Sequence, residues 1–435
     1  MGCSHLASSR ANIFALGAPL LNEITMNKSS QPRLRFFAQA SSQRHIPTQD
    51  QYLYRAPEAK FNIAIIGTGT IGQEHMRVAT LLGRAHVHGI YDLEQHSLDA
   101  AQAEYSTYSA RTLIRYKSLT QACEDPEVDA LFICTPNFTH FEVLKTAVHS
   151  GKPIFVEKPM ATTLADAAAI VQIANEYSSF IQIGLQYRYK AQYVEAFHET
   201  LVRASLGKVK TISMSEYRPP FLDKVKQWNK FNEYSGGTLV EKCCHYFDLI
   251  NLMAQAAPQR VYASGGRAVN FLDLEYEGRR ADIDDHAFVI IDYENGVRAN
   301  FTLNMFCPDF VEEMVVTGEF GRLLATERFD FHQQQPATAS ISLELGENGA
   351  SRTTSLGYPR VVEQSGHHGA TFFEHQAFFD QLEGKAADCA TPLQGMWAMI
   401  VASAAQESMH SGQPVAISEL ITREKLASLL AGKQE

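Results

Sequence analysis

The sequence predicts an α/β protein: a doubly wound parallel sheet (a Rossmann domain) followed by an α+β domain with a large, mostly antiparallel sheet. Three observations predict it. Strands and helices alternate between residues 60 and 184, a glycine-rich turn follows the first strand, and strands succeed one another without long helices over 260–318. A chain of 435 residues is long enough for two or three domains. We therefore divide it into an N-terminal extension (1–59), a nucleotide-binding domain (60–184) and a second domain (185–435).

The first strand leads into the most informative motif. An apolar run at 61–66 is followed by Gly67-x-Gly69-x-x-Gly72 and by a helical stretch at 74–82. In dinucleotide-binding folds, one glycine makes the tight turn, one lets the backbone approach the pyrophosphate, and one lets helix and strand pack closely. Unpaired N–H groups at the helix start favour phosphate. The predicted contacts to the pyrophosphate are Gly67, Gly69, Thr70, Ile71 and Gly72.

A carboxylate at the end of the second strand predicts the choice of cofactor. The strand at 85–91 ends in Asp92, twenty residues beyond Gly72, where a ribose-binding acid is expected. A carboxylate there accepts hydrogen bonds from the ribose hydroxyls and repels a 2′-phosphate. The sequence therefore favours NAD over NADP. A solvated loop acid is the alternative account of Asp92.

The remaining elements of this half continue the alternation, and parallel strands place their carboxyl ends at one ligand-binding edge. Two tripeptides follow such strands, Thr135-Pro136-Asn137 and Glu157-Lys158-Pro159. A lysine after an apolar strand can be a plain surface residue, but the predicted cleft and the proline that fixes the turn favour a functional role for Lys158. The predicted elements are helices at 99–105, 141–150 and 164–178 and strands at 130–134, 153–156 and 181–184.

The second half begins with a strand at 209–217, where apolar and polar residues alternate. The loop that follows contains Arg218, Lys224 and Trp228. We predict that Arg218 and Trp228 contact the substrate, although ordinary loop packing accounts for either residue alone. Strands are predicted at 260–265, 287–293, 298–306 and 312–318, with a hairpin turn at 294–296, a polar loop at 333–340 and helices at 372–382 and 394–410.

The composition excludes two classes of partner. A net charge of −10 and a pI near 5.9 argue against a nucleic-acid binder and against attraction to an anionic membrane. No apolar run reaches the roughly 20 residues of a membrane helix. Seven cysteines without a Cys-x-x-Cys pair favour neither a disulfide framework nor zinc, and fit a reducing cytoplasm. Adjacent residues point to different sides, so His367 and His368 do not predict a metal site; a place in the substrate pocket stays open for one of them.

The N-terminal extension differs from the rest of the chain. The apolar stretch at 11–21 resembles a signal peptide only weakly, because no small-x-small cleavage site follows it. Met26 is an alternative start, and the segment at 26–59 is rich in Ser, Gln and Arg with three prolines, which is typical of an extended arm. We therefore expect a cytoplasmic protein.

Several of these motifs together resemble the glucose–fructose oxidoreductase/inositol dehydrogenase/MocA (Gfo/Idh/MocA) family. They are the glycine turn, Thr135-Pro136-Asn137 with His140, Glu157-Lys158-Pro159, and the segment 236–249, GGTLVEKCCHYFDL. The resemblance runs from about residue 60 to 420. It implies an oxidoreductase that transfers a hydride between NAD and a secondary alcohol of a sugar, sugar acid or inositol-like cyclitol. It also implies a homo-oligomer, a dimer or a tetramer, formed through the sheet of the second domain.

The resemblance also implies which residues act. The family's catalytic lysine falls on Lys158, and its acid-x-x-x-His pair falls on Glu241 and His245, which with Lys158 also contact the substrate. The sequence departs from the family at Glu241, where Asp is most often found, and at Lys242, where an apolar residue is usual. The predicted cofactor contacts beyond the glycine turn are Asp92, Thr135, Pro136, Asn137, His140, Glu157, Lys158 and Arg188.

The spacing of this pair has a physical reading of its own. Glu241 and His245 are four residues apart in a helical run that begins at Thr238, so they share one face of a helix. Histidine can take a hydroxyl proton near neutral pH, and Lys158 can stabilise the negative charge that develops on the oxygen. Glu241 would then orient His245, although a plain contact on the helix surface is the alternative. Asp248 is expected to make a structural contact.

Two other functions are compatible with the same motifs. A glycoside hydrolase on this scaffold would use NAD transiently and cleave a chromogenic glycoside without net NADH. A non-catalytic sensor would bind NAD and a partner protein without turnover. Retention of both Lys158 and His245 argues against the sensor, which has no chemical reason to keep them.

Overall fold

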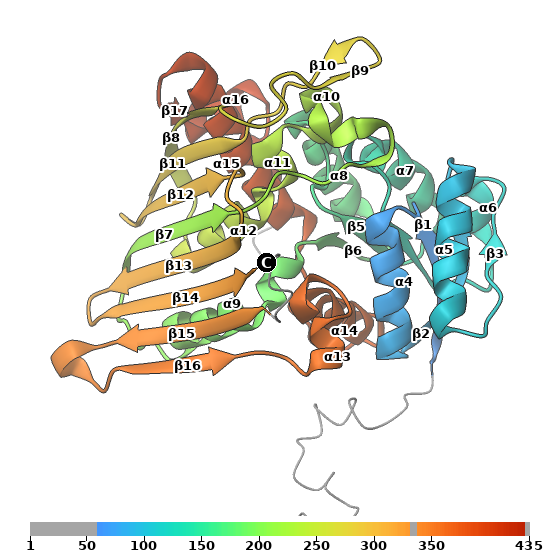
Figure 1. Cartoon of the computed structure of the whole chain (residues 1–435), viewed down its shortest axis with the longest axis horizontal. Coiled ribbons are helices and arrows are strands. Elements are labelled where there is room, and N and C mark those ends of the chain that lie inside the picture. Colours follow the sequence, from blue (N-terminus) through green and yellow to red (C-terminus); the bar gives the residue numbers. More distant parts are fainter. Residues whose placement is uncertain (1–58, 331–336, 431–435) are drawn as a thin grey trace, which may run out of the picture. The chain divides into compact units, whose positions relative to one another are not determined.

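The computed structural model describes residues 59–330 and 337–430 of the chain. In that part, six parallel strands form the first sheet in the order β3-β2-β1-β4-β5-β6, which confirms the predicted doubly wound arrangement (Figure 1). Its elements are β1 (Phe61–Ile66), α4 (Thr70–Leu82), β2 (Ala85–Tyr91), α5 (Gln95–Tyr108), β3 (Ile114–Arg115), α6 (Leu119–Glu124), β4 (Ala130–Ile133), α7 (His140–Ala147), β5 (Ile154–Glu157), α8 (Leu164–Glu176) and β6 (Ile181–Gly184).

The central strands of this sheet are covered on both faces, which explains their uninterrupted apolar runs. All four residues of β4 and of β5 are buried, as are the last four residues of β1. The helices differ from the prediction mainly at their ends. Helix α4 begins four residues earlier than predicted, directly after Gly69, so its first turn lies at the carboxyl edge of the sheet.

The second sheet is larger and mixed. Within the described residues its nine strands follow the order β16-β15-β14-β13-β7-β12-β11-β8-β17, and only β7 and β12 run parallel to each other (Figure 1). This confirms a large, mostly antiparallel sheet. The strands are β7 (Val209–Tyr217), β8 (Pro258–Gly266), β11 (His286–Tyr293), β12 (Arg298–Asn304), β13 (Phe310–Gly318), β14 (Arg322–Phe329), β15 (Thr338–Glu344), β16 (Arg352–Leu356) and β17 (Val415–Ala416).

One face of the large sheet is packed and the other is open. Helices α12 (Cys244–Ala254) and α15 (Pro392–Ser411) contact β7 and β8. Along β11, Val289 and Ile291 are buried on the packed face, whereas Phe288 and Ile290 alternate with them and are 60% and 51% exposed. Two large apolar side chains therefore stand side by side on the open face.

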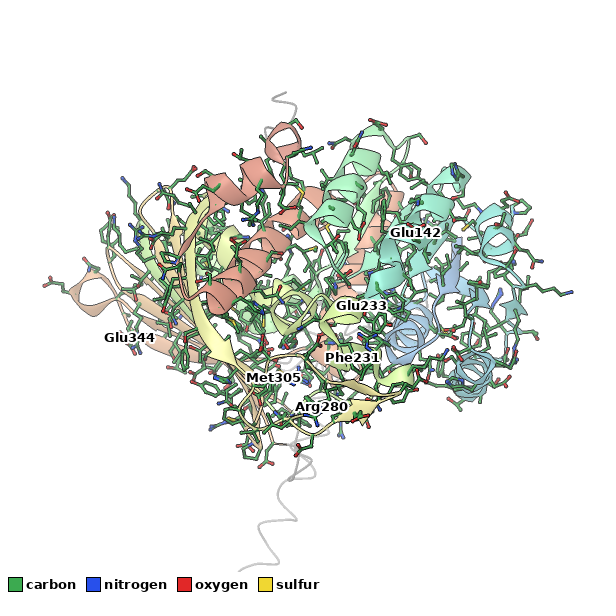
Figure 2. The ribbon with its side chains drawn as sticks, turned by 90° about the horizontal axis from the view of Figure 1, so that it is seen from above. Glu142, Phe231, Glu233, Arg280, Met305 and Glu344 are labelled. Atoms are coloured by element: carbon green, nitrogen blue, oxygen red, sulfur yellow. The ribbon has the colours of Figure 1, made fainter. Side chains whose placement is uncertain are left out.

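Some strands of the structure were not predicted from the sequence: β3, β14, β15, β16, β17 and a two-stranded hairpin. Strand β15 begins at Thr338, inside the stretch 333–340 that we expected to be a loop, and residues 331–336 lie outside the described part. Strand β15 is rich in Ser and Thr, so its sequence resembles a polar loop. A hairpin of β9 (Glu275–Tyr276) and β10 (Arg279–Arg280) also appears. Arg279 bonds Glu233 at 2.7 Å, which holds this hairpin against α10 (Asn232–Ser235), near the labelled Phe231, Glu233 and Arg280 (Figure 2).

The C-terminal part of the chain returns to the first sheet. Helix α14 (Ala370–Leu382) contacts α4, and the ring of Phe378 packs edge-on against Phe132 of β4 with centroids 5.0 Å apart. Phe379 stacks on Phe61 of β1 at 6.0 Å. The nucleotide-binding sheet is therefore completed by residues almost 200 positions beyond its last strand.

The predictions for the N-terminal arm, the signal-like stretch and Met26 fall outside the described residues. Within 59–330 and 337–430, no helix combines the length and the apolar character needed to cross a lipid bilayer. The described cysteines, 123, 134, 243, 244, 307 and 389, are all free thiols.

Candidate active site

A cleft of about 510 Å³ lies at the carboxyl ends of the first sheet's strands, a volume that suits a small organic ligand. It is also lined by the loop between β7 and α10 and by the start of α12. All the predicted site residues except Gly72 and Arg188 line it. They are Gly67, Gly69, Thr70, Ile71, Asp92, Thr135, Pro136, Asn137, His140, Glu157, Lys158, Arg218, Trp228, Glu241 and His245.

The three glycines of the turn differ in what a side chain would meet. A Cβ on Gly72 would lie 2.0 Å from the carbonyl oxygen of Gly67, so helix α4 can pack there only without one. Gly67 has a φ of +93° and no room for a Cβ beside Cys134. Gly69 instead faces open space. Because α4 has no side-chain cap and no acidic residue in its first turn, its N–H groups are available to an anion.

Two backbone N–H groups hold the Asp92 carboxylate beside this turn. One carboxylate oxygen accepts a hydrogen bond from the N–H of Thr68 at 2.7 Å, and the other accepts one from the N–H of Glu94 at 2.8 Å. The side chain is only partly buried and lines the cleft, so it can accept further hydrogen bonds from a ligand. This is the position that a ribose-binding carboxylate needs.

Side chains that follow β4 connect several of the segments that form the cleft. The two ring nitrogens of the buried His140 lie 2.8 Å from the carbonyl oxygens of Pro159 and Thr135, and burial lowers the pKa of this imidazole. The side-chain amide of Asn137 donates to the carbonyl oxygen of Ser235 at 3.1 Å. His140 therefore joins the ends of β4 and β5, and Asn137 joins this turn to α10.

Lys158 is anchored in the cleft by its neighbours. Its Nζ donates to the carbonyl oxygen of Glu241 at 3.0 Å. Behind it, the Glu157 carboxylate lies 2.8 Å from Nε2 of His75 and accepts a hydrogen bond from the N–H of Lys158. Burial opposes the charge on Lys158, but Glu241, Cys244 and Glu157 together outweigh burial and raise the pKa of the lysine. Lys158 is therefore a cation.

The predicted continuous helix from Thr238 is wrong. Helix α11 (Thr238–Glu241) ends at the predicted acid, and α12 begins only at Cys244. The break coincides with Lys242, whose Nζ turns inward and donates to the hydroxyl of Tyr187 at 2.6 Å. Within the described part of the chain no hydrogen bond joins Glu241 to His245. The predicted orienting role of Glu241 is therefore not supported.

His245 has a different support, which the sequence did not reveal. Its ring stacks on that of Tyr187, with centroids 4.0 Å apart and planes 8° from parallel. Its Nδ1 has no hydrogen-bond partner among the described residues, and the side chain is 1% exposed. Burial and the nearby charges of Lys158 and Lys242 lower the pKa of His245 well below its usual value. The imidazole is therefore neutral and able to take a proton.

The Glu241 carboxylate instead interacts with the charges of three nearby lysines. Burial opposes its ionisation, but Lys158, Lys224 and Lys242 together hold the pKa of its carboxyl below the usual value. Its backbone carbonyl positions Lys158, and its side chain balances part of the positive charge nearby. The longer side chain found here in place of aspartate thus lies among cations.

The expectation that Arg188 contacts the cofactor is not met. Its guanidinium makes two hydrogen bonds to Asp248, at 2.7 and 2.6 Å, and a third to the side chain of Gln394 at 3.0 Å. Both charged groups are buried, and Arg188 does not line the cleft. Asp248 therefore makes a structural contact, as expected, and its partner is an arginine side chain.

The adjacent histidines are separated by the fold. His367 lines the cleft and lies 2.7 Å from a carboxylate oxygen of Glu74, whereas His368 lies at the same distance from Glu327. No group of three or more His, Cys, Asp or Glu side chains in the described ranges is arranged to hold a metal ion. His367 thus takes the pocket-lining place that the sequence left open.

Comparison with known proteins places these features in a family. The model of an oxidoreductase family with an NAD-binding Rossmann fold, GFO_IDH_MocA, matches residues 61–185, and the model of its C-terminal α/β domain matches residues 199–417. The uncharacterized oxidoreductase YrbE of Bacillus subtilis is 28% identical over 246 residues, which cover 54% of this chain and 64% of YrbE. Myo-inositol 2-dehydrogenase of Thermotoga maritima is 23% identical over 364 residues, 82% of this chain and 99% of the relative.

A solved structure shows the same fold. Scyllo-inositol dehydrogenase from Lactobacillus casei, crystallised with NAD(H) and scyllo-inositol, superposes with a TM-score of 0.63 at 21% identity. The match covers 82% of this chain and 99% of that structure. Both domains therefore have counterparts in a single solved chain.

Proposed function

The chain belongs to the Gfo/Idh/MocA family of NAD-binding oxidoreductases, and we propose that it transfers a hydride between NAD and a secondary alcohol of a sugar, sugar acid or cyclitol. The observation that carries this proposal is the meeting of Lys158 and His245 in the same cleft as the glycine turn. One group is a half-buried cation and the other a buried neutral imidazole. Together they can hold a hydroxyl oxygen and accept its proton.

The residues present fit NAD. Gly69 leaves open space where the backbone must approach a pyrophosphate, the free N–H groups of α4 face the same cleft, and Asp92 stands ready for ribose hydroxyls. When bound, NAD supplies the hydride acceptor for alcohol oxidation. The protein binds and orients both molecules and handles the proton.

In the proposed mechanism His245 acts as the general base. Its neutral ring takes the hydroxyl proton as the C–H bond breaks, and the stacked Tyr187 fixes the plane of the ring. Lys158 donates a hydrogen bond to the same oxygen and stabilises the negative charge that develops there. Glu241 and Glu157 are positioning residues, because they hold Lys158 through its Nζ and its backbone N–H.

The first test is NADH formation against a panel of inositols, aldoses, sugar acids and amino sugars, with parallel wells that contain NADP. Production with one substrate class supports the dehydrogenase. Silence across the panel, with NAD binding confirmed, contradicts it. Cleavage of a chromogenic glycoside without net NADH would then identify the hydrolase, and absence of both activities would favour the sensor.

Asp92→Ala is expected to weaken NAD binding about 10-fold and to narrow the preference over NADP. The reason is that the variant loses an acceptor for the ribose hydroxyls and the charge that repels a 2′-phosphate. Titration of NAD and NADP by tryptophan fluorescence measures both changes. Asp99→Ala, which removes an exposed acid on α5, is the control. Unchanged dissociation constants for both cofactors in Asp92→Ala would refute the ribose role.

We also propose a homo-oligomer formed through the open face of the large sheet. Phe288 and Ile290 stand exposed there beside Tyr262 of β8, which is 41% exposed and lies opposite Ile290. Phe288→Asp is expected to convert the oligomer into monomers, because a buried charge would oppose the contact. Light scattering after gel filtration measures the mass. Val202→Asp, at an exposed apolar residue beside α9 (Ala191–Phe197), is the control. A Phe288→Asp protein of wild-type mass, or a wild-type monomer, would contradict the proposal.

We further propose that the enzyme works in the cytoplasm. All the cysteines of the described residues are free thiols, and four of them are buried. Free thiols are typical of proteins from a reducing compartment.

A further inference from the structure

Cationic side chains gather at the catalytic end of the cleft. Lys158, Arg218, Lys224 and Lys242 all line it. They come from four segments: the end of β5, the residue after β7, the loop before α10 and the turn between α11 and α12. Four separate parts of the chain therefore direct positive charge to one place.

Two carboxylates balance part of this charge. Glu216 of β7 is fully buried, with one carboxylate oxygen 3.1 Å from Nζ of Lys242 and 3.5 Å from Nη1 of Arg218. Glu241 lies among the lysines described above. The third nearby carboxylate, Glu157, is already hydrogen-bonded to His75. Two further carboxylates line the cleft but are engaged with other residues, Asp223 with Lys230 at 3.8 Å and Glu74 with His367 at 2.7 Å. Glu216 and Glu241 are therefore two counter-charges for four cations.

Lys224 carries the clearest part of this excess. Among the residues that the structure describes, its ammonium has neither an ion pair nor a hydrogen bond, and its nearest aromatic ring is that of Trp228, with Nζ 5.1 Å from the centroid. The charged groups that it senses most are Glu241 and Lys158, both at the catalytic end. A half-buried ammonium without a partner loses part of its hydration without compensation, and active sites keep such groups for ligands.

We propose that the substrate carries an anionic group, a carboxylate or a phosphate, which Lys224 and Arg218 bind. This inference rests on the proposed dehydrogenase function and narrows its substrate to an acidic sugar or a sugar phosphate. Lys242 is already engaged with Tyr187 and Glu216, and Lys158 is reserved for the reacting oxygen. Arg218 also contacts Glu216, but only through Nη1 at 3.5 Å, and its Nε donates to the carbonyl oxygen of Pro219. Lys224 and the Nη2 group of Arg218 can therefore contact a charged substituent through charge-assisted hydrogen bonds.

The test compares substrates that differ only in charge. NADH formation is measured with glucose, glucuronate and glucose 6-phosphate, with the matching galactose series, and with myo-inositol and its monophosphates. We expect kcat/KM for at least one anionic compound to exceed that of its neutral counterpart about 30-fold or more. The better of the uronate and phosphate arms identifies the anionic group. Equal or faster turnover of the neutral compounds would overturn the inference while the dehydrogenase function stands. No NADH from any compound would overturn the proposed function itself.

Variants then locate the anion-binding group. Lys224→Met is expected to raise KM for the anionic substrate about 10- to 100-fold, with kcat and the Kd for NAD nearly unchanged. Its KM for a neutral analogue should stay constant, and Lys224→Arg should recover most of the loss. Lys145→Met, at an exposed lysine of α7, is the matched control. An equal loss for neutral and anionic substrates would contradict the proposed role of Lys224.

A measurement on the wild-type enzyme covers the case in which Lys224→Met fails to fold. Inorganic phosphate and malonate, added separately, should inhibit competitively with the anionic substrate and only weakly with a neutral one. Inhibition of equal strength against both substrates would overturn the inference. So would the absence of inhibition when phosphate or malonate is present at 100 times the KM of the anionic substrate.

Discussion

Lys158→Met is expected to lower kcat about 1000-fold and to leave the Kd for NAD within about 3-fold of the wild-type value. The lysine is half-buried, cationic and anchored on the carbonyl oxygen of Glu241. Its remaining N–H groups can reach the substrate hydroxyl oxygen, on which negative charge develops as the proton leaves. A methionine of similar length keeps the packing and removes the charge. Stopped-flow measurement of NADH formation at saturating substrate separates the chemical step from binding.

Two comparisons make this result specific. Lys145→Met removes an exposed lysine and should retain wild-type kcat. Lys158→Arg keeps the charge but cannot place a single compact ammonium, and should recover only part of the rate. Wild-type turnover by Lys158→Met would remove this lysine from the mechanism. An equal loss of NAD affinity and kcat would assign it to the cofactor instead.

His245→Asn is expected to lower kcat/KM for alcohol oxidation about 100- to 10,000-fold, because no neighbouring group replaces the base. The pH profile gives the sharper readout. Burial and the nearby lysines lower the pKa of His245, so the neutral base persists as pH falls below 6.5 and is lost only when pH passes the lowered value. The acid limb of the wild-type profile should therefore lie below pH 6.5.

The same limb should vanish in the variant, whose residual rate should rise with hydroxide concentration. Circular dichroism across the pH range shows that the protein remains folded. Tyr187→Leu provides a positioning comparison: loss of the stacked ring should lower kcat more than it changes KM and keep the acid limb. An acid limb that survives in His245→Asn would assign the titration to another group.

Local patterns predicted most of the nucleotide-binding half. The glycine turn, Asp92 and the two strand-end tripeptides depend on short-range geometry, because a parallel sheet brings the carboxyl ends of its strands together whatever the loops contain. Strands β2, β6 and β7 have the predicted bounds. The family model describes an NAD-binding fold, which confirms the predicted cofactor, and the position of Asp92 agrees with it.

Long-range contacts account for what the sequence did not predict. Tyr187 supports His245 from 58 residues away, and no spacing rule joins them. The break after Glu241 depends on a buried partner for Lys242, which periodicity cannot reveal. The family resemblance implied a cofactor contact for Arg188, but its guanidinium is hydrogen-bonded to Asp248. In each case the deciding partner comes from another element.

The return of α14 to the first sheet has a consequence for protein engineering and for evolution. His375 of this helix lies 2.6 Å from His75 of α4, and its aromatic neighbours pack on β1 and β4. A fragment cut after β6 would leave that apolar surface in water, so the nucleotide-binding half is not a portable module. Chimeras that exchange substrate specificity between relatives should therefore graft an internal segment and retain the C-terminal helix of the recipient. Changes in substrate range can therefore evolve in the segment between β6 and α14, whose two ends are both attached to the first sheet.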